Sequence, residues 1–345
     1  MKKRGLLAAA AALCLLAGCK KSELTEYENG IENLEKQKYE QALRNFENAI
    51  QKGEQSVLSW RGIGIARMGQ GDYEKAEEAF STALGITEKK EKALQRDLYL
   101  YLADTQYHQE DYQGCIETCT QLLETDAHQD GYFLRGSSYL RRSEYKKAED
   151  DFEEVISNST DYQDYLDIYR IYQECGLSAD GAEYLEAALD LKGNSAEEYY
   201  QRGRIYYYLS EYKDAEKSLK KALDKDYEQA ALYLGKVYAE ELDYEQAISM
   251  YKSCLETEDM QSEAYNGLAC CAAAEEDYEK ALSYIEKGLK TKEPEMKQVL
   301  LFNQIVFLEE SMDFVSAKEK ISEYLELYPQ DQDALREYYY FLQTR

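Results

Sequence analysis

Thiol and imidazole groups are the side chains of this 345-residue sequence best suited to metal binding or nucleophilic chemistry. The sequence has eight cysteines but only two histidines, His108 and His128. Together with Cys115 and Cys119, these histidines have the composition of a zinc site. Cys115 and Cys119 are four residues apart and share one face of a predicted helix, but it is the face expected to lie in the core. A buried free cysteine there acts as a small apolar residue. We favour packing over metal binding and predict no metal and no cofactor.

Catalytic motifs are absent from the sequence. No serine or cysteine stands beside a histidine in a recognisable pattern, and no phosphate-binding glycine loop or paired-histidine helix occurs. Acidic pairs are frequent, but they fall at positions expected to face solvent, where charged runs are ordinarily hydrated. The sequence therefore predicts no catalytic residues and indicates a protein that is not an enzyme.

The N-terminus has the pattern of an exported protein. Three basic residues at positions 2–4 precede an apolar segment at 6–17, too short for a membrane span of about 20 residues but typical of a signal peptide. Its end, Leu16-Ala17-Gly18-Cys19, resembles the bacterial lipobox. The resemblance implies cleavage before Cys19 and a diacylglyceryl group on its sulfur. The alternative is an ordinary signal peptide with a chance cysteine.

The lipobox resemblance sets the expected location. Residues 1–18 would be the signal peptide and residues 19–22 a lipidated tether. Two acyl chains make a stable anchor where one chain would not. We expect the protein on the extracytoplasmic side of a cell membrane, either the outer face of the cytoplasmic membrane or, in a two-membrane cell, the outer membrane.

Composition limits both the partners and the fold. The chain carries 68 acidic and 41 basic residues, a formal charge of −27, which argues against nucleic acid as a partner. Only two prolines interrupt a composition rich in helix-forming residues, so an almost wholly helical chain is predicted. The 34 tyrosines are interpreted mainly as large packing residues on partly exposed helix faces.

One six-residue sequence motif recurs along the chain, as in Gly71-Asp-Tyr-Glu-Lys-Ala76 and Ser210-Glu-Tyr-Lys-Asp-Ala215. It ends on a small residue each time. These closing residues are Ala42, Ala76, Cys115, Ala148, Gly181, Ala215, Ala247, Ala281 and Ala317. Their spacing of about 34 residues in a helical composition is typical of stacked helical hairpins. The copy ending at Gly181 is the weakest.

The best copy resembles the tetratricopeptide repeat (TPR). It reads Trp60-x2-Ile63-Gly64, Gly71-Asp72-Tyr73, then Ala76-x3-Phe80 and Ala83. The resemblance implies an all-α fold, a right-handed α-solenoid of about nine helical hairpins over residues 23–329, with a capping helix at 330–345. Each hairpin would place Gly or Ala where its two helices cross. Aspartates such as Asp72 stand where the second helix needs an N-cap.

The six remaining cysteines can be placed on this repeat frame. They are Cys115, Cys119, Cys175, Cys254, Cys270 and Cys271, enough for three disulfides in an oxidising compartment. Cys115, Cys119 and Cys254 take positions that the repeat buries, which favours packing as free thiols. The redox state of the six stays open.

In TPR proteins the first helices of the hairpins line a concave groove in which a peptide commonly lies. Three successive repeats place a cation at the position expected to point into it, namely Arg170, Arg204 and Lys236. Aromatic residues are expected nearby at Phe133, Tyr200, Tyr207 and Tyr233. A ladder of cations suits carboxylates. The alternative interpretation is that the same cations balance the charge of acids on adjacent turns, such as Asp167, Glu174 and Glu240.

These features favour a membrane-anchored scaffold or adaptor that binds other proteins or peptides in the groove. Envelope assembly, secretion and surface-complex organisation are the expected settings. The alternative function is a surface-exposed binding protein for a small molecule or glycan, using the tyrosine-rich groove.

Overall fold

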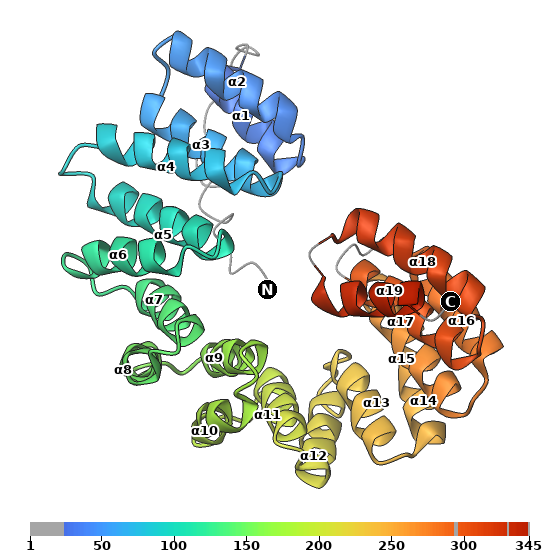
Figure 1. Ribbon diagram of the computed structural model, residues 1–345. Helices are drawn as coiled ribbons and strands as arrows, with labels where there is room; N and C mark the ends of the chain where they lie inside the picture. Colours follow the sequence, from blue (N-terminus) through green and yellow to red (C-terminus); the bar gives the residue numbers. More distant parts are fainter. Residues whose placement is uncertain (1–23, 293–295, 330, 344–345) are drawn as a thin grey trace, which may run out of the picture. The chain divides into compact units, whose positions relative to one another are not determined.

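The computed structural model describes residues 24–292, 296–329 and 331–343, and all regular secondary structure in this part is helical, without strands. Residues 1–18 and Cys19 lie outside the described residues. Nineteen α-helices follow one another as nine antiparallel hairpins and a last single helix (Figure 1). The prediction of an all-α helical-repeat fold is confirmed. No described helix is long and apolar enough to cross a membrane.

The chain forms two compact units that divide at Val155 and Ile156. The first unit holds four hairpins, in which each first helix is followed by its antiparallel second helix. They are α1 (Glu26–Glu35) with α2 (Tyr39–Gln51), α3 (Ser56–Gly69) with α4 (Tyr73–Ile86), α5 (Lys92–His108) with α6 (Tyr112–Leu123), and α7 (Gln129–Arg141) with α8 (Tyr145–Ile156).

The second unit holds five hairpins and the final helix. The hairpins are α9 (Tyr162–Glu174) with α10 (Ser178–Ala188), α11 (Ala196–Tyr208) with α12 (Tyr212–Leu223), α13 (Ala230–Glu240) with α14 (Tyr244–Ser253), α15 (Gln261–Ala274) with α16 (Tyr278–Gly288), and α17 (Lys297–Glu310) with α18 (Phe314–Leu327). The last helix, α19 (Gln332–Gln343), packs against α18.

Five of the nine second helices begin directly after one of the predicted aspartates. Asp72 accepts a hydrogen bond from the backbone N–H of Lys75, and Asp277 accepts one from Lys280. Equivalent caps are made by Asp111, Asp243 and Asp313. Each cap satisfies a backbone donor that the first turn of a helix leaves free. The weak fifth repeat lacks such a cap at Leu177 before α10, and so do α2 after Lys38 and α12 after Glu211.

The core of each hairpin is centred on the residue four positions after the closing small residue. All nine of these side chains are buried: Phe46, Phe80, Cys119, Phe152, Leu185, Leu219, Tyr251, Ile285 and Ile321. A Cβ placed on Gly64 would lie 2.5 Å from the Phe80 ring, and one on Gly203 would lie 2.5 Å from Leu219. The crossing glycines are therefore needed because a large side chain of the second helix fills their space.

The cysteines of the described residues are all free thiols. Cys115, Cys119, Cys254 and Cys271 are buried, as packing positions require. Cys270 is exposed on α15 and Cys175 is half-buried, and neither belongs to the three positions that the repeat was expected to bury.

Candidate functional site

The first helices of successive hairpins contact one another directly in the second unit, in the order α9, α11, α13, α15. Residues on their shared side form what we call the inner face of the second unit. The three cations predicted for a groove lie on three of these helices, Arg170 on α9, Arg204 on α11 and Lys236 on α13. Phe133 belongs instead to the first unit, where its ring lies 6.1 Å from that of Phe152.

Arg170 is neutralised within its own helix. Its Nη2 donates to Oδ1 of Asp167 at 2.8 Å, and its Nε lies 3.9 Å from Oε1 of Glu174. These are two of the acids that the charge-balance interpretation names. For Arg170 that interpretation describes the observed contacts.

Lys236 is neutralised by the next hairpin. Its Nζ lies 2.6 Å from Oε1 of Glu263 on α15, and 4.5 Å from the centre of the Tyr233 ring. Burial alone would lower the pKa of this ammonium, but Glu263 and Tyr233 outweigh burial and the pKa is raised. Glu263 was not anticipated from the sequence, because it lies 27 residues from Lys236 and meets it only through helix stacking.

Arg204 has no carboxylate partner in the described part of the chain. Its Nη1 donates to Oε1 of Gln201 at 2.7 Å and of Gln163 at 3.5 Å. The guanidinium carbon lies 5.5 Å from the centre of the Tyr200 ring and 5.4 Å from that of Tyr233. Its Nε is buried without a hydrogen-bond acceptor. Arg204 therefore keeps a positive charge among amides, aromatic rings and the hydroxyl of Tyr233, to which it is hydrogen-bonded.

The tyrosines around Arg204 pack on one another. The Tyr233 ring meets Tyr200 edge to face at 5.7 Å and Tyr207 at 5.8 Å, and its hydroxyl lies 3.1 Å from that of Tyr208. We call Arg204, Lys236 and these four tyrosines the Arg204 cluster. The structure thus brings together five of the seven predicted site residues and adds Tyr208.

The charges of the cluster act on its tyrosines. Burial would raise the pKa of the Tyr233 hydroxyl, but the positive charges of Arg204 and Lys236 outweigh burial and the pKa lies below its ordinary value. Tyr207 donates to Glu240 at 3.4 Å, and burial, followed by this carboxylate, raises its pKa to about 12. Two positive charges, those of Arg204 and Lys236, thus lie beside the Tyr233 ring, which favours an anionic ligand.

The other sequence candidates lie apart from this cluster. Nε2 of His108 is 3.7 Å from Asp104, and its ring stacks on Tyr73, whereas Nδ1 of His128 accepts from the backbone N–H of Asp130 at the start of α7. No group of three potential metal ligands occurs in the described residues.

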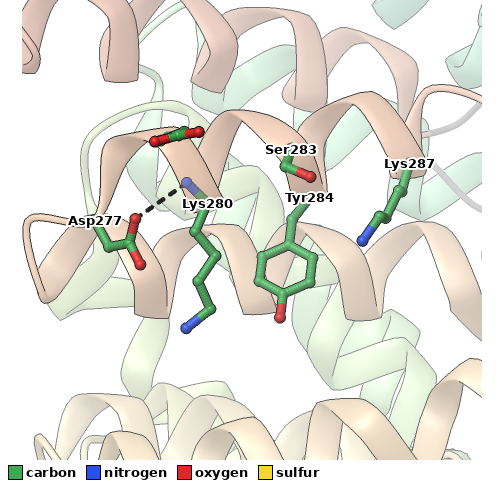
Figure 2. A pocket seen from close by; sticks show the side chains of 6 residues that line it. Asp277, Lys280, Ser283, Tyr284 and Lys287 are labelled. Carbon is green, nitrogen blue, oxygen red and sulfur yellow. Dashed lines mark hydrogen bonds between the residues drawn. The ribbon is translucent and has the colours of Figure 1, made fainter.

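A small hollow of about 290 Å³ lies on α16. It is lined by Asp277, Glu279, Lys280, Ser283, Tyr284 and Lys287. Figure 2 shows these side chains along one helix, with the backbone of Lys280 bonded to the capping Asp277. Because one helix lines it with both signs of charge, the hollow has neither the enclosure nor the field of the Arg204 cluster.

The stacked hairpins define an all-α helical-repeat protein. The tetratricopeptide repeat family model matches residues 27–91, 200–253 and 234–294. The chain is a tetratricopeptide repeat protein, and such repeats indicate a scaffold for protein–protein interaction.

Known proteins of the same kind are distant relatives. Superkiller complex protein 3 of Homo sapiens is 26% identical over 280 residues, 74% of this chain and 18% of the human protein. A TPR repeat-containing protein of Methanocaldococcus jannaschii is 25% identical over 208 residues, 56% of this chain and 35% of the relative. The chain thus spans well under half the length of either.

One solved structure shares the fold over most of the chain. A tetratricopeptide repeat protein from Parabacteroides merdae has a TM-score of 0.50 at 16% identity, covering 75% of this chain and 99% of its own. At this identity the likeness shows the fold alone.

Proposed function

We propose that this protein is a lipid-anchored scaffold that binds an acidic segment or chain terminus of a protein partner on the inner face of its second unit. One observation carries the proposal: Arg204 is a partly buried cation without a carboxylate partner in the described residues, and one of its donors is unused. A carboxylate that enters the cluster gains a charge-assisted hydrogen bond to a desolvated arginine.

The structure indicates that the three cations contribute unequally to the affinity for a ligand. Arg170 and Lys236 already contact carboxylates, so a ligand would have to compete with bonds inside the protein. Arg204 loses no ion pair when it binds a ligand. It should therefore contribute most of the affinity.

The test compares two single substitutions on the same face. A partner is first captured from a detergent extract of the producing cells, identified, purified and titrated against each variant. Arg204→Gln should weaken its binding by about 1.5–3 kcal/mol, whereas Arg170→Gln should change it little. Equal binding by wild type and Arg204→Gln, at low as well as physiological salt, would rule out this site and leave the scaffold in place.

The anchor part of the proposal rests on the signal segment and on Leu16-Ala17-Gly18-Cys19. A lipid on Cys19 would hold the scaffold at the extracytoplasmic side of a cell membrane, where a role in envelope assembly, secretion or surface-complex organisation follows. Metabolic labelling with a fatty acid should mark the wild type and not Cys19→Ala. Equal labelling of both would remove the lipid anchor from the proposal.

The glycan or small-molecule alternative receives less support from the geometry. A sugar would need open ring faces to stack on, but Tyr200 and Tyr233 lie edge to face against each other and beside Arg204, and Tyr233 is only 9% exposed. A glycan-array signal that Arg204→Gln abolishes, together with failure to capture any protein partner, would favour the alternative.

A further inference from the structure

A second group of cations surrounds one aromatic ring on another side of α11. The guanidinium carbon of Arg202 lies 4.8 Å from the centre of the Tyr199 ring. The Nζ atoms of Lys221 and Lys225 lie 5.1 Å and 5.9 Å from the same point. Tyr199 and Arg202 belong to α11, Lys221 to α12, and Lys225 follows α12 by two residues. We call these four residues the Tyr199 site.

The three cations converge on the Tyr199 ring, and no ion pair neutralises their charges in the described residues. None of them forms an ion pair with a carboxylate in the part of the chain that the structure describes. Arg202 donates through Nη2 to the backbone carbonyl of Gly193 at 2.7 Å. The carboxylate of Glu198 lies within electrostatic range of Arg202, but it is held as a cap by the backbone N–H of Ser195 at 2.7 Å.

Such a cluster is unfavourable for folding alone. Like charges four residues apart on a helix repel each other, and lysines occur at this spacing at positions 213, 217, 221 and 225. The negative end of the α12 dipole explains why lysines stand near its C-terminus. It does not explain why Arg202 approaches the same ring from a different helix.

The fourth hairpin has the same pairing of an arginine with a tyrosine ring, but there a carboxylate of the protein neutralises the arginine. There Arg135 lies 5.7 Å from the centre of the Tyr132 ring, at the repeat positions that Arg202 and Tyr199 occupy in the sixth hairpin. Arg135 donates through Nε and Nη2 to the two carboxylate oxygens of Asp151, at 2.9 and 2.7 Å. The sixth hairpin has Ser218 at the position of Asp151, so its arginine lacks that anion.

We propose that the Tyr199 site binds a phosphate group, which supplies from outside the anion that Asp151 supplies in the fourth hairpin. A phosphate monoester carries about −1.5 to −2 charges and three acceptor oxygens at neutral pH, enough to engage three cations at once. Arginine binds such a group through two parallel hydrogen bonds, and lysine acts as a point charge. The phosphate belongs either to a soluble ester or to a phospholipid headgroup, and the two arms of the test distinguish these sources.

The test neutralises the site and compares it with a matched control. The site variant is Arg202→Gln, Lys221→Gln and Lys225→Gln in one chain. The control, Lys213→Gln, Lys217→Gln and Lys220→Gln, removes the same charge from the same hairpin without touching the Tyr199 ring. In one arm, inorganic phosphate is titrated into each full-length protein by calorimetry at constant ionic strength. In the other, each protein is sedimented with vesicles of phosphatidylglycerol or of phosphatidylcholine.

The site variant should bind at least about tenfold more weakly than wild type, equivalent to about 1.4 kcal/mol, and the control within about twofold. Loss in the phosphate arm alone indicates a soluble ester, and loss of phosphatidylglycerol binding alone indicates a headgroup. Equal binding by wild type and site variant in both arms, or equal weakening in both variants, overturns the proposal.

A stability measurement separates binding from a structural role. Without phosphate, the site variant should unfold at a temperature no lower than the control variant, because both lose three positive charges and only the site variant relieves repulsion among the converging cations. An unfolding temperature clearly below that of the control in phosphate-free buffer would assign the cations to the fold and would also overturn the proposal. Neither result depends on whether Arg204 binds a protein partner.

Discussion

Glu309 is the residue whose ionisation should be most visible in the stability of this protein. Its Oε1 is buried without a hydrogen-bond donor near the end of α17. Burial first, then the carboxylates of Glu337 and Glu310, raise its pKa to about 7. The folded state therefore binds more protons than the unfolded state between the ordinary glutamate pKa and about pH 7. Stability should fall as the pH rises through this window.

Replacing Glu309 by glutamine should raise the thermal unfolding midpoint at pH 8 and leave it nearly unchanged at pH 5. We expect a gain of about 1 kcal/mol, well below the full linkage value because the side chain is partly exposed. Glu319→Gln, on an exposed position of α18, is the control. Equal gains at both pH values would show that the effect is not the charge of Glu309.

Asp151 should stabilise the protein, because its carboxylate is paired with the guanidinium of Arg135. It accepts two hydrogen bonds from Arg135, and both side chains are largely buried. Asp151→Ser, which gives the fourth hairpin the residue that the sixth carries as Ser218, should cost about 2–4 kcal/mol by leaving the arginine unpaired. Chemical unfolding measures this loss, and a cost below about 1 kcal/mol would contradict the importance of the pair.

At the scale of the helix pair, side chains at the crossing are complementary in size. Glycine on the first helix faces a large side chain on the second, as Gly64 faces Phe80 and Gly235 faces Tyr251. Alanine replaces glycine where the second helix carries a smaller residue, as Ala103 packs with Cys119. In these hairpins a small residue on one helix makes room for the larger one on the other, as close-packed interiors require.

Gly203→Leu should destabilise the protein by about 1–3 kcal/mol, because the new side chain must displace Leu219. Gly85 near the end of α4 is the matched control, since a Cβ there would meet nothing within 4 Å. Gly85→Ala should stabilise by about 0.5–1 kcal/mol through helix propensity. Denaturant titrations of both variants test the pair, and a neutral Gly203→Leu would mean that the crossing is loosely packed.

Local patterns predicted the hairpins well. A helix turn requires a cap at a set distance from its first apolar residue, so aspartates such as Asp72 and Asp313 were readable from the sequence. The closing small residues also predicted the nine second helices, because each lies at a set distance from the start of its helix.

The candidate site was less predictable. Arg170 pairs on its own helix, whereas Lys236 pairs with Glu263 of the next hairpin, and that difference depends on how stacked helices align.

Two features of the structure, the Tyr199 site and the division into two compact units, could not be predicted from the sequence pattern. The Tyr199 site combines side chains of two helices and becomes evident only when its arginine is compared with Arg135 in space. The division into two compact units at Val155 also depends on contacts between helices. In the sequence, only the weak fifth copy, ending at Gly181 just beyond this division, marks the region as unusual.

At the scale of the whole molecule, the net charge of −27 is the dominant electrostatic property. Self-repulsion of a highly charged chain destabilises its compact state. The attractive terms are weaker, because many ion pairs lie on exposed helix faces, such as Lys146 with Asp150, where each contributes about 0–1 kcal/mol. The less exposed Arg135–Asp151 pair is little affected by salt. Repulsion should therefore determine the sign of the salt effect.

Salt should accordingly stabilise this protein at neutral pH. Raising NaCl from about 0.01 M to about 0.15 M shortens the Debye length from about 30 Å to about 8 Å, and the unfolding midpoint should rise by about 2–6 °C. At about pH 4.5, near the ordinary glutamate pKa, many of the 68 carboxyl groups are neutral and the gain should shrink. Circular dichroism melts at both pH values measure the two gains. A midpoint that falls with salt at neutral pH would show that the ion pairs outweigh the repulsion, and the exposed pairs would then have to stabilise the solenoid far more than isolated surface pairs do.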